Sequence, residues 1–136
     1  MSVLLWLRIS SIVSAVFAAG HTLGGLKSWS PVGETPVLAV MRATHYDVQG
    51  ASRTYLDFYR GFGYSLSVSM FVQALVLWQL CAIARTNPAL VRPIVGSFAA
   101  ASLAGLAVSG MFLFPVPTMF SAALSGCLIV TFFSAK

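Results

Sequence analysis

Four long apolar stretches constrain what this chain can fold into more than any other feature. They cover residues 3–23, 53–84, 89–112 and 116–133. Each is long enough to cross about 30 Å of hydrocarbon as an α-helix. A backbone inside a bilayer must satisfy its own hydrogen bonds, which favours helices. We therefore predict an all-α fold, a bundle of four transmembrane helices in a single domain over residues 1–136.

The composition is that of a membrane protein. Hydrophobic residues make up 58% of the chain and charged residues 8%, against roughly 25% charged residues in a soluble domain. The net charge of +5 arises from a scarcity of acids, because the chain contains no run of Lys and Arg. Membrane lipid is therefore the expected partner, and nucleic acid is not.

The second apolar stretch, which begins near Arg53 or Tyr55, is unusually long. Residues 53–84 would reach about 48 Å as one helix, since each residue adds about 1.5 Å. We expect its first two turns to project beyond the hydrocarbon, or a kink at Gly61 or Gly63 to break the helix.

One segment differs from the rest of the chain. Residues 21–64 hold all three acids, both histidines and four of the eight basic residues. Charged groups are costly inside a membrane, so this segment is where function is expected. Its middle, residues 24–52, is predicted to be a long polar loop without strands. Within this loop a short interfacial helix is predicted, with Thr35 as N-cap and Pro36 as its first residue.

The candidate acid/base residues are His21, Glu34, Asp47 and Asp57. His21 lies between glycines and is suited to proton transfer. Alternatively, it is an interface histidine bonded to loop backbone. If the second helix begins at Arg53, that residue shares a helix face with Asp57 and Arg60. Pairing with an arginine would keep Asp57 ionised, either as a stabiliser of charge or within a merely structural charge network.

Aromatic and polar side chains near the same helix start are candidates for contacting a substrate. The tyrosines would orient an oxygenated ligand or, alternatively, form an aromatic belt at the membrane interface. Gln73 lies within the span and needs a hydrogen-bond partner. The full set of candidate binding residues is Arg53, Tyr55, Tyr59, Arg60, Tyr64 and Gln73.

Metal binding is not predicted. His21, Glu34, His45 and Asp47 have no standard ligand spacing, and the reaction classes considered below require no cofactor.

Small residues recur at four-residue spacing in the third stretch, at Ser97, Ala101, Gly105 and Ser109. Such stripes let helix backbones approach closely. The pattern indicates a packed bundle but leaves open whether the partner helix is in the same chain or in another copy.

Three segments carry a resemblance to a known family: GHTLGG (20–25), KSWSPVGETPV (27–37) and SRTYLDFYRGFGYSLS (52–67). The chain resembles a family of small four-helix bacterial integral membrane proteins, and this resemblance implies no particular activity. More distantly, its layout is similar to emopamil-binding and related isomerase-like membrane bundles, whose catalytic motifs do not align here. We expect a bacterial inner-membrane protein with cytoplasmic termini, because Arg85 and Arg92 flank a short turn on that side.

Two functional hypotheses follow. The first is a small membrane enzyme or binding bundle for a lipophilic substrate, such as an isoprenoid, sterol or polyketide. It would use cofactor-independent acid/base chemistry for isomerisation, cyclisation or epoxide opening. The alternative is a non-catalytic accessory or anchor subunit, in a homo-oligomer or a larger membrane complex, with the polar loop as its docking surface.

Overall fold

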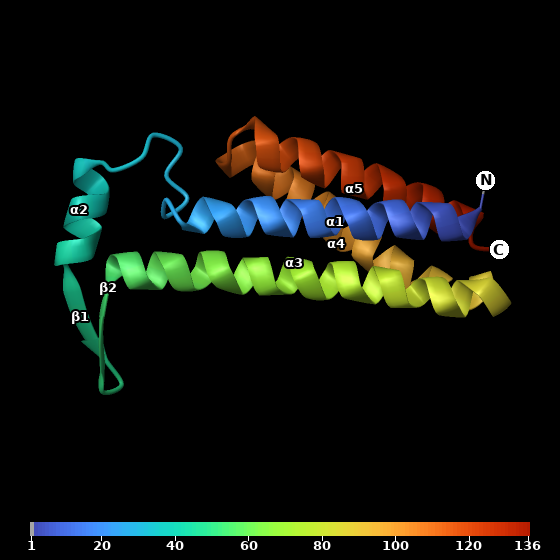
Figure 1. The fold of residues 1–136 in the computed structure, drawn as a ribbon, viewed down its shortest axis with the longest axis horizontal. Coiled ribbons are helices and arrows are strands. Elements are labelled where there is room, and N and C mark those ends of the chain that lie inside the picture. The colour runs from blue at the N-terminus through green and yellow to red at the C-terminus, as the bar shows by residue number, and fades with distance from the viewer. Residues whose placement is uncertain (1) are drawn as a thin grey trace. The chain divides into compact units, whose positions relative to one another are not determined.

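The computed structural model of this protein describes residues 2–136 and is nearly all helical (Figure 1). The all-α prediction is confirmed. Its elements, in chain order, are α1 (Val3–Gly25), α2 (Pro36–Ala43), β1 (His45–Val48), β2 (Ala51–Thr54), α3 (Tyr55–Thr86), the short 3₁₀ helix η1 (Pro88–Val91), α4 (Arg92–Phe112) and α5 (Pro115–Ser134). Four helical segments are long and apolar enough to cross a membrane: α1, α3, η1 with α4, and α5.

The chain packs as two compact units, each with its own internal contacts. The bundle unit comprises residues 1–17 and 70–136, and the polar unit comprises residues 18–69. Helices α1 and α3 each contribute residues to both units. The polar unit therefore coincides closely with the polar segment of the sequence.

The bundle unit contains four helical segments, from α1, α3, α4 and α5. Serines link α1 to α3: Ser11 donates to the Ala74 carbonyl at 2.8 Å and Ser14 to the Met70 carbonyl at 3.2 Å. Short side chains allow this close approach of backbones. The buried core of the unit consists of Leu7, Leu77, Leu80, Cys81, Ala84, Val91, Val95, Ala99, Leu124, Leu128 and Ala135.

The small-residue stripe of α4 lies mostly on an exposed face. Ser97, Ala101 and Gly105 are exposed, whereas Ser109 is buried. Contact between α4 and α5 involves another residue, since Ser102 Oγ lies 2.8 Å from Ser125 Oγ. Most of the predicted stripe is therefore not used within this chain.

Helix α3 is continuous from Tyr55 to Thr86, so of the two alternatives the break at Gly61 or Gly63 does not occur. A reciprocal capping box sets its start. Thr54 Oγ1 accepts from the Asp57 N–H at 3.0 Å, while Asp57 Oδ2 accepts from the Thr54 N–H at 3.0 Å and from the Thr54 hydroxyl at 2.9 Å. The helix therefore begins at Tyr55, one of the two predicted starts, and Arg53 lies outside it.

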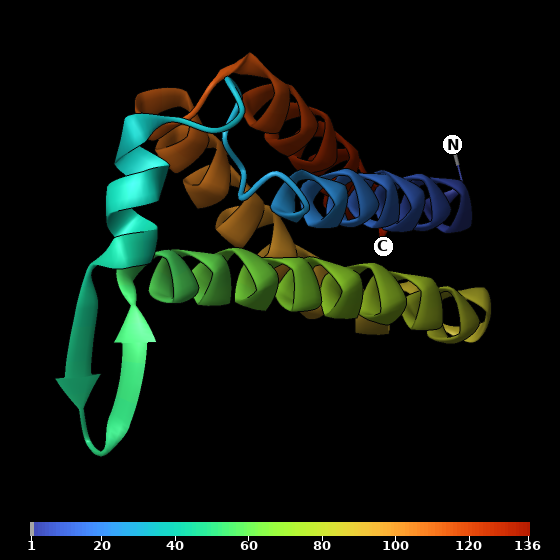
Figure 2. The ribbon, with the colours of Figure 1, turned by 60° about the vertical axis from the view of Figure 1, so that its left-hand side comes forward.

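Residues 45–54 form an antiparallel hairpin, so the expectation of a loop without strands is wrong (Figure 2). His45 pairs with Thr54 and Val48 with Ala51. The turn residues Gln49 and Gly50 have φ of 51° and 80°, as a two-residue type I′ turn requires. Most of the hairpin is exposed and its sequence lacks clear apolar alternation, which is why the pattern did not reveal strands.

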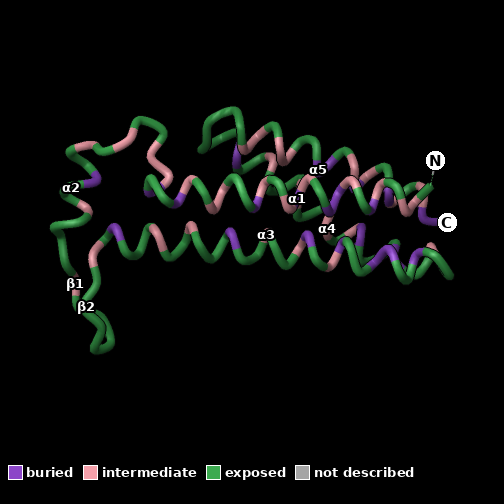
Figure 3. The backbone as a smooth tube through the Cα atoms, viewed as in Figure 1, coloured by how far each residue is buried: buried purple, intermediate pink, exposed green. Residues whose placement is uncertain are grey.

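Helix α2 confirms the predicted short helix after Thr35. The Thr35 hydroxyl oxygen accepts a hydrogen bond from the Leu38 N–H at 3.3 Å. Leu38 is buried, while Val37 and Val40 are exposed. Figure 3 shows that most of the chain from α2 through β2 is exposed. The apolar side chains on the outside of α2 are suited to the membrane interface predicted for this helix.

Candidate functional site

Trp29 occupies the centre of the polar unit. Its indole Nε1–H donates to the His21 carbonyl at 2.8 Å. Its ring lies 5.3 Å from the His21 ring, 4.9 Å from the Tyr64 ring and 6.2 Å from the Tyr59 ring, measured between centroids. The space beside His21 is therefore filled by a side chain of the protein itself.

A tight turn after α1 brings Trp29 back against that helix. The Ser28 N–H donates to the Gly25 carbonyl and the Trp29 N–H to the Gly24 carbonyl, both at 2.9 Å. Ser28 and Trp29 have φ of 53° and 51°, a left-handed conformation that non-glycine residues seldom adopt. The turn is thus a specific structure in which two consecutive residues are held in an uncommon conformation.

Three glycines make room for the indole. A Cβ at Gly25 would lie 2.9 Å from Trp29 Cζ2, and one at Gly24 would lie 3.2 Å from Trp29 Cδ1. A Cβ at Gly63 would overlap the indole ring. Gly24 and Gly25 were predicted to be irregular loop backbone, but both belong to α1. Their function in the fold is to receive Trp29.

The imidazole of His21 is also engaged. Its Nδ1 lies 2.9 Å from Ser67 Oγ. The Ser67 hydroxyl donates to the Gly63 carbonyl at 3.3 Å, so its oxygen is left to accept the Nδ1–H of His21. Ser67 is buried at 3% exposure. The imidazole is thus bonded to a side chain of α3, and not to loop backbone as the structural alternative predicted.

Arg60 completes this closed side of α3. Its Nε and Nη2 donate to Ser28 Oγ at 3.1 and 2.8 Å, and Ser28 is buried at 5% exposure. Arg60 and Asp57 do not form an ion pair within residues 2–136, and Arg53 bonds the neighbouring Ser52 carbonyl at 2.7 Å. The predicted arginine–aspartate pairing is therefore wrong, because the capping box takes Asp57 and the buried serine takes Arg60.

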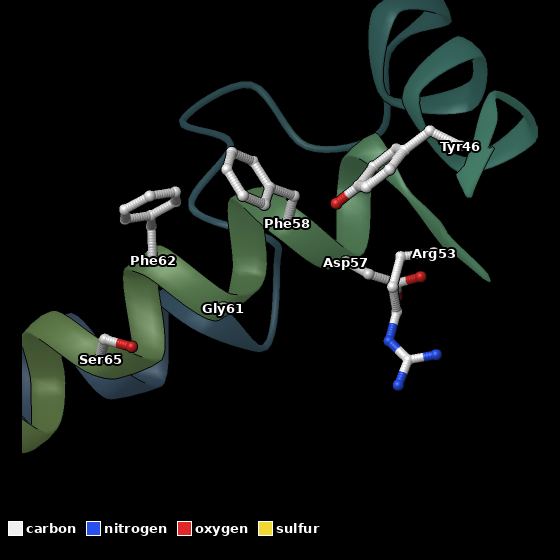
Figure 4. Close-up of a pocket in the computed structure, with 7 residues that line it drawn as sticks. All are labelled: Tyr46, Arg53, Asp57, Phe58, Gly61, Phe62 and Ser65. Atoms are coloured by element: carbon white, nitrogen blue, oxygen red, sulfur yellow. The ribbon is translucent and has the colours of Figure 1, made fainter. Parts of the chain in front are cut away.

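An open groove lies on the opposite side of α3, with a volume of about 340 Å³ (Figure 4). Phe58, Gly61, Phe62 and Ser65 are spaced i, i+3, i+4 and i+7, so they share one helix face. Tyr46 reaches over from β1 toward the start of the helix. The full lining is Tyr46, Arg53, Asp57, Phe58, Gly61, Phe62 and Ser65.

Aromatic rings form a continuous series along this groove. The Tyr46 ring lies 5.2 Å from that of Tyr55 and 6.2 Å from that of Phe58, and Phe58 lies 4.8 Å from Phe62. Edge-to-face pairs of this kind stabilise one another. Phe58 and Phe62 are 56% and 65% exposed, so their outer faces are free to contact another molecule.

Both charged side chains of the groove lie at one end. Arg53 at the end of β2 and Asp57 in the first turn of α3 are there, and the Tyr46 side chain approaches the same end. Phe58, Gly61, Phe62 and the hydroxyl-bearing Ser65 follow further along the helix. Arg53 pairs with Tyr46 across the hairpin, which places this cation at the polar end.

The structure brings together only part of the predicted set. Asp57 and Arg53 line the groove, and Tyr55 lies beside Tyr46. Tyr59, Arg60 and Tyr64 instead belong to the closed side with His21. Gln73 lies in the bundle unit, and its side chain makes no hydrogen bond to any of residues 2–136.

The two loop acids lie apart from the groove. Glu34 forms an exposed ion pair with Arg42 at 3.1 Å, and Asp47 is exposed on β1. Residues 2–136 contain no group of three or more His, Cys, Asp or Glu side chains placed to hold a metal ion.

Sequence reasoning missed several lining residues. Phe58 and Phe62 carried an i, i+4 aromatic pattern that indicates one helix face. Tyr46 could be found only with the hairpin known, because the pairing of β1 with β2 brings it to α3. Trp29 was the sole tryptophan in the polar segment, which was a usable indication of its central position.

Together the four long apolar helical segments of residues 2–136 indicate a small helical membrane protein. No protein-family model, curated protein or solved structure matches this chain.

Proposed function

We propose that this protein is a membrane-embedded binding protein for a lipophilic molecule with a polar, anionic end. The binding site is the groove along the first turns of α3. Of the isoprenoid, sterol and polyketide classes expected from the sequence, isoprenoids and polyketides that carry a phosphate or carboxylate fit this description, whereas the polar group of a sterol is a neutral hydroxyl. The observation that carries the proposal is that Arg53 lies at one end of the groove and the exposed rings of Phe58 and Phe62 follow along it.

At the polar end, the side chain with unused hydrogen-bond donors is Arg53. The Asp57 carboxylate already accepts two hydrogen bonds from Thr54. The Arg53 guanidinium donates one bond, to a backbone carbonyl beside it, and a guanidinium has five N–H donors. Arg53 therefore has donors to spare for a carboxylate or phosphate group on the ligand.

Binding is supported better than proton transfer. Asp57 is the single member of the candidate acid/base set that lines the groove. His21 is bonded to Ser67 and covered by Trp29, while Glu34 and Asp47 are exposed elsewhere. Acid/base chemistry needs groups within hydrogen-bond reach of one substrate, whereas binding needs only the groove.

Photolabelling with a diazirine-bearing fatty acid tests the proposal. This probe has a carboxylate for Arg53 and an alkyl chain for the aromatic rings. In detergent-purified protein we expect the label to concentrate on the peptide that contains residues 55–65. Gly61→Leu should lower that labelling several-fold, because a Cβ at Gly61 meets no atom within 4 Å and the added side chain fills the groove.

Gly20→Leu is the matched control, because a Cβ at this helical glycine also meets no atom within 4 Å. Its labelling should equal that of the wild type. Arg53→Gln should weaken labelling by the acid probe but not by its methyl ester. Uniform labelling of all apolar helices, unchanged by Gly61→Leu, would reject the groove as a binding site.

The alternative function, a non-catalytic accessory subunit, is favoured by the exposed small residues of α4. Ser97, Ala101 and Gly105 have no partner helix within the described chain, residues 2–136. Disulfide crosslinking of an Ala101→Cys variant in native membranes tests this function. A disulfide between the introduced cysteines of two copies of this chain, or between this cysteine and another protein, would support the accessory function. If the cysteine at position 101 forms no crosslink and reacts only with lipid-soluble thiol reagents, the result counts against it.

We further propose the bacterial inner membrane, with both termini in the cytoplasm. Basic residues are divided four and four between residues 18–69 and the rest of the chain, but Arg85 and Arg92 flank the short connection between α3 and α4. Lys and Arg are enriched on the cytoplasmic side of membrane proteins. A fluorescent protein fused to the C-terminus should fold and fluoresce, and an alkaline phosphatase fusion at the same place should be inactive. The reverse pattern would overturn the orientation.

A further inference from the structure

A small cavity with two arginines in its lining lies in the bundle unit. It has a volume of about 190 Å³ and is lined by residues from α1 and α3: Arg8, Trp78, Gln79, Cys81, Ala82 and Arg85. Trp78, Ala82 and Arg85 are spaced i, i+4 and i+7, so they share one face of α3. The cavity belongs to a different unit from the groove, and its interpretation does not depend on the proposed function.

The two arginines of this cavity have no acidic partner in their unit. Neither guanidinium forms an ion pair with any of residues 2–136. The Arg8 guanidinium lies 6.0 Å from the Trp78 ring centroid and within hydrogen-bonding reach of the Cys81 thiol. Arg92 lies over the Phe132 ring at 4.6 Å. The cavity is thus lined by two cations that have no acidic partner.

The other lining residues suit the headgroup region of a membrane. Gln79 is exposed, and its carboxamide makes no hydrogen bond within residues 2–136. Trp78 is 53% exposed, and tryptophan is enriched where the membrane meets water. Arg85 lies in the last turn of α3, where a positive charge also complements the helix dipole.

From these observations we propose that the cavity binds the phosphate group of an anionic phospholipid. Guanidinium groups match phosphate oxygens in geometry and remain charged. A zwitterionic headgroup would bring its own ammonium beside the two arginines, which disfavours it. The Gln79 amide and the Trp78 ring would contact the glycerol region and the first part of an acyl chain.

Native mass spectrometry of the protein released from mixed nanodiscs tests this site. The nanodiscs contain phosphatidylglycerol and phosphatidylcholine in equal amounts. We expect the wild-type protein to retain more phosphatidylglycerol than phosphatidylcholine. In the Arg8→Gln/Arg85→Gln variant, the amount of retained phosphatidylglycerol should fall about tenfold. The matched control, Arg92→Gln/Lys136→Gln, removes the same charge from the same unit and should retain the lipid as the wild type does.

Gln79→Leu provides a second variant that leaves the charge unchanged, and it should lower retention several-fold. If both double variants lose the same amount of bound phosphatidylglycerol, the lipid is attracted by the overall positive charge, and the proposed site is rejected. Equal retention of the two lipids would also overturn it. Displacement of the lipid by millimolar inorganic phosphate would assign the cavity to a free anion instead. Fatty-acid labelling of residues 55–65 should be unchanged in all these variants, which separates this test from that of the groove.

Discussion

The two opposite faces of α3 in the polar unit are built differently. One face, with Gly63 and Ser67, is closed by Trp29 and His21. The other, with Phe58 and Phe62, is open. The comparison shows that a residue capable of acid/base chemistry, such as His21, can have a structural role. The face with Phe58 and Phe62, which has fewer titratable groups, is the better binding surface.

The largest expected effect comes from filling the closed face. Gly63→Leu would force Trp29 out of its place and should lower the free energy of unfolding by about 3 kcal/mol. Gly61→Leu, on the open face, should leave it unchanged or raise it by up to about 1 kcal/mol, because leucine favours helix over glycine. Thermal unfolding in detergent measures both, and equal losses would break the comparison.

The arginines on the two sides should differ as well. Arg60→Gln removes two hydrogen bonds to buried Ser28 and should cost about 1.5 kcal/mol. Arg53→Gln removes a bond to an exposed carbonyl and should leave stability within about 0.5 kcal/mol of the wild type. Urea titration at low salt checks the pair. A larger loss of unfolding free energy in Arg53→Gln than in Arg60→Gln would mean that the open side contributes more to stability than the closed side.

Removing the helix cap should have a smaller effect. Thr54→Ala takes away the hydroxyl that accepts from the Asp57 N–H and should cost about 1 kcal/mol. Thr54→Ser keeps a hydroxyl there and should be close to wild type. Hydrogen exchange of the amides in the first turn of α3 reports the change locally. Equal exchange in the alanine and serine variants would contradict the role of the cap.

The smallest predicted effect is a coupling between His21 and Ser67. A double-mutant cycle with His21→Ala and Ser67→Ala should give an interaction free energy of about 0.5 kcal/mol. Additive effects would mean that the 2.9 Å contact contributes nothing to stability and would reopen the question of what His21 does.

Much of the fold could be predicted from the sequence, because long apolar stretches have few alternatives in a membrane. The four long helices and the cap at Thr35 are local consequences of composition and of residue order. The hairpin could not be predicted, because its strands are short and exposed. The sequence signal for it was limited to the turn residues Gln49 and Gly50. Without the hairpin, Arg53 was assigned to a helix face that it does not occupy.

The site was harder to predict than the fold. His21 looked reactive because glycines surround it, but Gly25 and Gly63 are needed by Trp29. A sequence shows that space exists beside a glycine and does not show what fills it. The i, i+4 spacing of Phe58 and Phe62 was a local signal for one helix face, and neither residue was among the predicted site residues.

Photolabelling by the diazirine fatty acid, compared between Gly61→Leu and His21→Ala, tests the central claim most directly. The claim is that the open face of α3 binds the ligand and the closed face supports the fold. We predict a several-fold loss of label on residues 55–65 in Gly61→Leu, and wild-type labelling with lower thermal stability in His21→Ala. Loss of labelling in His21→Ala, with wild-type labelling in Gly61→Leu, would contradict the account.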